Sequence, residues 1–155
     1  MRLALYQPDI PQNTGAMLRL AACFGLGVDV IEPCGFVFDD KRLRRVGMDY
    51  LSHVEVKRHT SWAAYLAWRK ESAGDAGRLI LLSTQAALPY AEAQYGPADS
   101  LLVGQESAGV PDLVRNAADL AVRIPMRPGL RSLNVAMAAA IVAGEAIRQV
   151  GFPST

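Results

Sequence analysis

The chain has 155 residues, of which 51% are hydrophobic and 20% are charged, and its formal net charge at pH 7 is +1. These values are ordinary for a soluble globular protein with a core of its own. No apolar run approaches the ~20 residues of a membrane span, and the N-terminus lacks a signal-peptide pattern, so we expect a cytoplasmic protein without a membrane partner. Because the net charge is near zero, any affinity for nucleic acid must come from a local basic patch.

The metal-binding residue types are few and scattered. Cys23 and Cys34 occur in different local contexts, without a Cys-x-x-Cys motif or a His-rich partner. His53 and His59 lack ligand spacing and are expected to be surface or hydrogen-bonded residues. The sequence therefore predicts neither a metal site nor a disulfide framework.

The hydrophobic pattern predicts strands and helices in alternation. Short apolar runs predict strands at residues 2–6, 28–31, 54–58, 79–82, 100–103 and 120–124. Helical spacing predicts five helices. The first runs from a cap at 13–15 to a glycine at 25 or 27, and the second covers 39–46. The others run from 61 to about 73–74, over 111–116 and over 132–149. This order is typical of an α/β domain with a mainly parallel sheet. No linker or repeat interrupts residues 1–155, so we expect a single domain.

Glycine-bearing loops follow several of the predicted strands, where open α/β sheets bind their ligands. None of these loops is a Gly-x-Gly-x-x-Gly fingerprint or a P-loop. In the loop over residues 102–111, Gly104 ends a strand and would let a ligand approach the backbone, and Glu106 lies between glycines. The alternative interpretation is a plain strand-to-helix turn with a solvated acid.

A Ser-x-Asn pair opens the last predicted helix, directly after a proline-rich loop at residues 124–129. Ser132 and Asn134 are placed where side chains and free N–H groups of a first helical turn point outward together. Helix starts of this kind bind carboxylates and phosphates. The alternative is that both residues are only helix caps.

Three segments in order carry a resemblance. Residues 13–19 follow an Asn-x-Gly-x-x-x-Arg pattern, residues 102–109 contain Gly-x-Glu-x-x-Gly, and residues 124–134 run from Ile-Pro-Met to Ser-x-Asn. Together they resemble the three motifs of the SPOUT superfamily of RNA methyltransferases. Residues 6–15, 31–36 and the Asp-Asp-Lys-Arg-Leu-Arg-Arg block within 39–50 are similar to one branch, the minimal bacterial enzymes that methylate the wobble ribose of leucine tRNAs.

This resemblance implies a single domain with a C-terminal trefoil knot and no separate RNA-binding domain. It also implies that S-adenosyl-L-methionine is the methyl donor and that the acceptor is the 2′-hydroxyl of the wobble cytidine or uridine, in the anticodon stem-loop. The residues that match cofactor contacts in the family are Leu82, Gly104, Ile124 and Ser132. Main chain near Leu82 and Ile124 would supply an apolar slot for adenine, and Gly104 has no side chain to block the ribose.

Arg19 and Asn134 match the catalytic positions of the family. We expect Arg19 to orient the acceptor RNA by holding a phosphate, because a guanidinium with a pKa above about 12 is a poor proton acceptor. Without the motif, Arg19 would be interpreted as a surface arginine. The identity of the proton acceptor and the role of Glu106 stay open.

Four positive charges within five residues predict an RNA-binding face on the short helix at 39–46, alongside Arg19. These residues are Lys41, Arg42, Arg44 and Arg45. The acids that precede them allow a simpler explanation, since acids first and bases later both favour the helix dipole. Trp62, Tyr65 and Trp68 keep helical spacing, which favours a place in the core or an interface over a base-stacking platform.

The last predicted helix is rich in alanine and ends its apolar stretch near Ala143-Gly144, which permits close approach of another backbone. In the family this helix and the first one form a homodimer, and arginine from one subunit serves the cofactor of the other. Two alternatives remain: an enzyme of the same superfamily that acts on another RNA ribose, and a non-catalytic RNA-binding relative.

Overall fold

A single parallel sheet organises the chain. The computed structural model describes residues 1–39, 41, 50–72 and 74–153. Its seven strands are β1 (Arg2–Tyr6), β2 (Gly27–Ile31), β3 (Val56–His59), β4 (Leu79–Leu82), β5 (Leu88–Pro89), β6 (Ser100–Val103) and β7 (Leu120–Arg123). They follow the order β3-β2-β1-β6-β4-β7-β5, and every neighbouring pair is parallel. The predicted α/β fold with a mainly parallel sheet is confirmed, while the trefoil knot stays a prediction of the resemblance.

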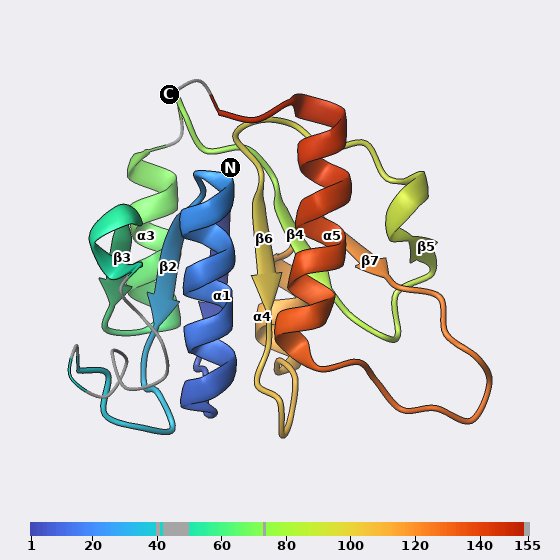
Figure 1. Cartoon of the computed structure of the whole chain (residues 1–155), viewed down its shortest axis with the longest axis horizontal. Coiled ribbons are helices and arrows are strands. Elements are labelled where there is room, and N and C mark those ends of the chain that lie inside the picture. The colour runs from blue at the N-terminus through green and yellow to red at the C-terminus, as the bar shows by residue number, and fades with distance from the viewer. Residues whose placement is uncertain (40, 42–49, 73, 154–155) are drawn as a thin grey trace.

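Helices cover both faces of the sheet (Figure 1). The helices α1 (Pro11–Phe24) and α5 (Val135–Val150) pack against each other on one face, and α3 (Trp62–Glu71) and α4 (Asp112–Ala117) lie on the other. Short 3-10 turns occur at η1 (Leu51–His53) and η2 (Tyr90–Glu92). Across the described residues, no helix combines the length and apolar character that a membrane span requires.

Two hydrophobic cores form because side chains of a strand alternate between the faces of the sheet. In β1, Leu3 and Leu5 join the core under α1 and α5, whereas Ala4 and Tyr6 join the core under α3 and α4. The aromatic residues predicted for a core or an interface follow this division, since Trp62 and Tyr65 are buried in the second core. Burial on both faces explains why the central strands β4 and β6 are almost wholly apolar.

The first helix begins earlier than predicted. Asn13 does not cap it, because α1 already starts at Pro11, with Ile10 as the N-cap residue. Proline is well suited to this first position, since its fixed φ is helical and its missing N–H would have no partner there. Asn13 therefore lies in the first turn, and its side chain is free for a tertiary contact.

The last helix begins later than predicted. It starts at Val135, and Asn134 is its N-cap, with the side-chain Oδ1 accepting hydrogen bonds from the N–H groups of Ala136 (2.9 Å) and Met137 (3.3 Å). Ser132 is not a cap and belongs to the preceding loop. The predicted helix at 39–46 lies mostly outside the described residues, and so do Arg42, Arg44 and Arg45.

A charged cluster is buried across the three strands at one side of the sheet. Asp29 in β2 has no exposed surface, and its carboxylate contacts Arg2 Nε at 2.7 Å and His59 Nε2 at 2.9 Å. The prediction that His59 is a hydrogen-bonded residue is confirmed. Arg2 also pairs with Glu55 at 3.0 Å, but that carboxylate is exposed. A buried charge that loses its partner is costly, whereas an exposed pair contributes little.

We therefore expect Asp29→Ala to lower the free energy of unfolding by about 3–5 kcal/mol, because it leaves Arg2 without its buried partner. The matched control is Glu55→Gln, which breaks the exposed pair of the same arginine and should cost no more than about 1 kcal/mol. Urea unfolding of both variants measures the difference. Equal losses in the two variants would show that the buried carboxylate has no special role.

Candidate functional site

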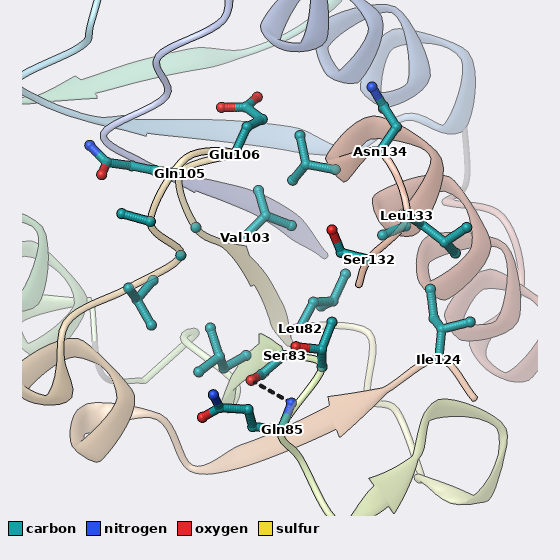
Figure 2. Close-up of a pocket in the computed structure, with 18 of the residues that line it drawn as sticks. Leu82, Ser83, Gln85, Val103, Gln105, Glu106, Ile124, Ser132, Leu133 and Asn134 are labelled. Atoms are coloured by element: carbon teal, nitrogen blue, oxygen red, sulfur yellow. Dashed lines mark hydrogen bonds between the residues drawn. The ribbon is translucent and has the colours of Figure 1, made fainter. Parts of the chain in front are cut away.

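A cavity of about 610 Å³ opens at the edge of the sheet where β4, β6 and β7 end (Figure 2). Its walls come from the loops that leave these three strands and from the start of α5. The lining residues are Ile10, Asn13, 81–85, 103–106, 108–110, Arg115, Val122, Ile124, Met126, 131–135 and Ala138. Because the strands are parallel neighbours, their carboxyl ends meet at one edge, which is where open α/β sheets bind ligands.

The structure brings five of the predicted site residues together. Leu82, Gly104, Ile124, Ser132 and Asn134 all line the cavity, although they come from four separate parts of the chain. Figure 2 shows Leu82 and Ile124 near one end and Asn134 near the other. Residues that the motifs predict for one site therefore lie around one cavity in the folded chain.

Arg19 is not among the residues that line the cavity of its own chain. Its side chain is exposed on α1, and its guanidinium lies over the ring of Tyr50, 4.9 Å from the ring centroid. Lys41 is also exposed. Arg42, Arg44 and Arg45 lie outside the described residues.

Gly104 has a steric role inside the chain in addition to the expected one. A Cβ atom at this position would lie 2.5 Å from the backbone carbon of Gly109. The two glycines come close because Gln105 and Gly109 exchange backbone hydrogen bonds of 2.9 and 2.8 Å, and Gly109 has a φ of +63°. Gly104 is thus required to close its own loop, whatever ligand lies beyond it.

A side-chain hydrogen bond joins the starts of the two long helices. Asn134 Nδ2 donates to Oδ1 of Asn13 at 2.9 Å, across 121 positions of sequence. Since Asn134 Oδ1 already caps α5, both ends of this amide are used. The bond fixes the start of α1 against the wall of the cavity.

Two carboxyl groups meet beside the cavity. Asp9 accepts hydrogen bonds from the backbone N–H of Glu106 (3.2 Å) and from the hydroxyl of Ser107 (2.5 Å). Both carboxyl oxygens of Glu106 are buried. Burial is the main cause that raises the pKa of Glu106, and the adjacent Asp9 adds to it, while the interaction with Glu106 lowers the pKa of Asp9. Glu106 is therefore a carboxyl group that retains its proton to higher pH than usual, and not the solvated acid of the simpler interpretation.

The cavity combines an apolar wall with charged groups. Its apolar side chains come mainly from the strand ends and include Val103, Val122, Ile124 and Met126. Charged side chains on the lining are Arg115, Arg131 and Glu106, and the Nε atom of Arg115 is buried without a hydrogen-bond partner among the described residues. Among those residues no group of His, Cys, Asp or Glu is arranged to hold a metal ion. Such a cavity fits an organic ligand that has a flat apolar part and a charged tail.

The chain is similar to known proteins over nearly its whole length. The model of the SpoU rRNA Methylase family matches residues 1–144. A tRNA (cytidine(34)-2'-O)-methyltransferase of Beijerinckia indica is 57% identical over 149 residues, which are 96% of this chain and 91% of the relative.

Two solved structures resemble the whole chain. One, from work on the 2-OH methylation of C/U34 on tRNA, is 38% identical with a TM-score of 0.87, covering 96% of this chain and 94% of its own. The other is the SpoU methyltransferase AviRb from Streptomyces viridochromogenes in complex with the cofactor AdoMet. It is 28% identical with a TM-score of 0.86 and covers 96% of this chain and 60% of its own.

The chain belongs to the SpoU rRNA methylase family, and the resemblance to SPOUT RNA methyltransferases is confirmed.

The sequence pattern did not indicate two residues at the site, Asp9 and Arg115. Asp9 lies within the segment 6–15, but no local pattern indicates that it holds the loop of Glu106 from 97 positions away. Arg115 also escaped notice, because a single arginine in a short helix carries no signal until the fold places it beside Gln85.

The raised pKa of Glu106 predicts a dependence of stability on pH. A carboxyl group whose pKa is raised by folding contributes stability below its ordinary value of 4.5, and this contribution is lost as the pH rises through the raised pKa. Glu106→Gln stays neutral, so the variant should gain stability relative to the parent protein as the pH rises from 4.5 towards 8. The measurement is urea unfolding of both proteins across this range.

The control is Asp9→Asn in the same series. It removes one neighbour that raises the pKa of Glu106, so the pH dependence attributed to Glu106 should become weaker. The lowered pKa of Asp9 itself acts in a different window, below 3.8. A constant difference between Glu106→Gln and the parent protein at all pH values would contradict the assignment.

Proposed function

We propose that this protein is an S-adenosyl-L-methionine-dependent tRNA 2′-O-methyltransferase that modifies the wobble nucleotide, cytidine or uridine 34, of leucine tRNAs. The observation that carries the proposal is that residues from all three motifs line one cavity, Asn13 from the first and loop residues from the other two. The reaction is the one named for a relative that is 57% identical over nearly the full length. A similar structure concerns the same hydroxyl of nucleotide 34. The restriction to leucine tRNAs rests on the resemblance in residues 6–15, 31–36 and 39–50.

The residues of the cavity fit the cofactor. Leu82 and Ile124 supply apolar contacts for a nucleobase, and the backbone at Gly104 and Ser132 borders the remaining space. A related enzyme has been solved with AdoMet bound. S-adenosylmethionine supplies an electrophilic methyl group on a sulfonium centre. The task of the protein is to align the acceptor hydroxyl with that group and to exclude competing water.

The acceptor side needs a second subunit. Arg19 is exposed and outside the cavity of its own chain. This position is compatible with the arrangement that the family resemblance implies, in which Arg19 serves the cavity of a partner copy. Exposed apolar side chains lie where this copy would pack: Ile10 before α1, Leu133 before α5, and Met137 and Ile141 one turn apart on α5. The helices α1 and α5 pack against each other on one face of the sheet (Figure 1). The active protein is therefore a homodimer with composite sites.

Each polar residue then has a role. Arg19 holds a phosphate next to the target ribose, since a guanidinium is a strong bidentate ligand and a poor base. Asn134 is a positioning residue, because its amide both caps α5 and holds Asn13. The anticodon stem-loop contacts the basic group Lys41, Arg42, Arg44 and Arg45. The reaction takes place in the cytoplasm, on a single domain without a metal or a membrane partner.

The decisive experiment uses unmodified leucine tRNA, the purified protein and methyl-labelled cofactor. We expect one methyl group, at the 2′-hydroxyl of nucleotide 34, which makes the following phosphodiester resistant to nuclease. A methyl group at another ribose would support the broader superfamily alternative. Calorimetry that detects no cofactor binding would favour a non-catalytic RNA-binding relative.

Subunit complementation tests the composite site. Arg19→Ala should lower kcat by about a hundredfold or more, while cofactor affinity stays within about twofold, because the arginine acts on the acceptor side. Ser132→Trp should block the cavity itself. Mixed in equal amounts and reassociated, the two inactive variants should recover about a quarter of the parent activity, since half of the dimers contain one intact composite site. Absence of recovery in a verified mixed dimer would exclude an arginine shared between subunits.

A further inference from the structure

The loop between β7 and α5 carries positive charges and no negative one. Residues 120–144, which include this loop, contain Arg123, Arg127 and Arg131 and neither aspartate nor glutamate. Figure 1 shows that the loop, drawn in orange, swings away from the sheet before it returns to the start of α5. Arg127 and Arg131 are both exposed there. A chain with a net charge of only +1 therefore concentrates cations on a projecting segment.

The three arginines differ in their partners. Arg123 is fastened to the fold, because its Nε donates to the backbone oxygen of Ala87 at 3.3 Å. The side chains of Arg127 and Arg131 form no ion pair or hydrogen bond within the part of the chain that the structure describes. By contrast, the exposed Arg148 in the last turn of α5 pairs with Glu145 at 2.8 Å. The charges of Arg127 and Arg131, here called the loop arginines, are thus available to a partner from outside the chain.

A tight turn presents the loop arginines. The N–H of Leu130 donates to the backbone oxygen of Arg127 at 3.4 Å, and Gly129 has a φ of +87°. Proline followed by glycine at the centre of such a turn is typical of type II, because proline fixes the first φ and glycine adopts the positive one. The turn restricts the backbone before any partner arrives, so a partner that binds it orders less of the chain.

The position of this turn indicates what the partner is. Arg131 and Ser132 line the cavity, so the loop forms part of its rim. Glu106 is the one acid on the described lining, and both of its carboxyl oxygens are buried. The exposed charge at this part of the rim is therefore positive. Leu130, which is 66% exposed, adds an apolar side chain between the two cations. Phosphates that alternate with sugars and bases match such a surface.

We propose that the loop arginines form a second RNA-binding surface, which holds phosphates of the substrate RNA at the mouth of the cavity. This inference rests on the proposed function for the identity of the RNA. It goes beyond that function because the basic group at 41–45 lies on a different segment. The loop belongs to the subunit whose cavity it borders, whereas Arg19 comes from a partner copy in the proposed dimer. The RNA is then held by both subunits.

The test measures the affinity of the intact protein for unmodified leucine tRNA over a range of salt concentrations. Each phosphate contact adds about 0.7–0.9 to the slope of log affinity against log salt, which is about five- to eightfold in affinity between 1 M and 0.1 M salt. The double variant Arg127→Gln, Arg131→Gln should therefore lose about 25- to 60-fold at 0.1 M salt, together with about 1.4–1.8 of the slope. Lysine at both positions keeps the charges and should retain the affinity within about threefold.

The matched control is Arg148→Gln, which also removes one exposed positive charge, but one that Glu145 already compensates. Its tRNA affinity should stay within about twofold of the parent value, since an exposed ion pair contributes little. Calorimetry with S-adenosylmethionine measures the cofactor affinity of every variant, and sedimentation measures its oligomeric state. Thermal unfolding verifies that each variant is folded.

Parent affinity and parent salt slope in the double variant would overturn the proposal. Equal weakening in Arg148→Gln would also overturn it, because overall charge would then explain the effect. Loss of cofactor affinity with unchanged tRNA affinity would assign the loop arginines to the methyl donor instead, and dissociation of the dimer would assign them to a protein interface.

Failure of the proposed function gives a different pattern. The parent protein would then bind tRNA with a salt slope that the double variant reduces, yet transfer no methyl group to nucleotide 34. A parent protein that binds no tRNA contradicts both proposals.

Discussion

The parallel pairing of β4 with β6 and β7 is the constraint on which the site depends. Ile80, Leu81 and Leu82 pair in register with residues 120–122 of β7, and Leu79 to Leu81 pair with residues 100–102 of β6. This register brings three strand ends to the same height at one edge, so the loops that follow face a common space. Gly104 and Gly109 lie close together, so the loop after β6 is compact. It therefore borders the cavity without filling it. A change of register in any of these strands would separate the residues that the motifs name.

Hydrogen bonds between distant segments fix the walls of the cavity. Asn134 and Asn13 join α5 to α1, and Asp9 holds the loop that carries Glu106 and Ser107. Such bonds restrict loops that would otherwise be mobile, and a ligand then binds with less loss of conformational entropy. The charged groups of the cavity also lie apart from each other. Glu106, whose pKa is raised, lies near the starts of α1 and α5, and Arg115 of α4 lies beside Gln85 in the turn after β4.

Much of this arrangement could be predicted from local sequence. Short, mostly apolar runs predicted the six longer strands, and the signal is strongest in β4 and β6, which are buried along most of their length. The two-residue strand β5 and the 3-10 turns were missed, since so few residues carry no periodicity. The start of α1 differed from prediction because its N-cap is the apolar Ile10, which carries no capping signal, and the start of α5 differed because both Ser132 and Asn134 are plausible caps. The motifs identified Leu82, Gly104, Ile124, Ser132 and Asn134 correctly as neighbours, although not the steric reason for Gly104.

The sequence by itself determined the class of fold, the family and the segments that form the cavity, because these depend on residue type and spacing along the chain. Only the tertiary structure decided which distant side chains meet. The contact between Asn13 and Asn134, the carboxyl pair of Asp9 and Glu106, and the hydrogen bond of Arg115 to Gln85 all join residues from separate loops or helices. The physical reason is that hydrogen-bond geometry and burial are properties of positions in space, and no local pattern specifies them before the strands are paired.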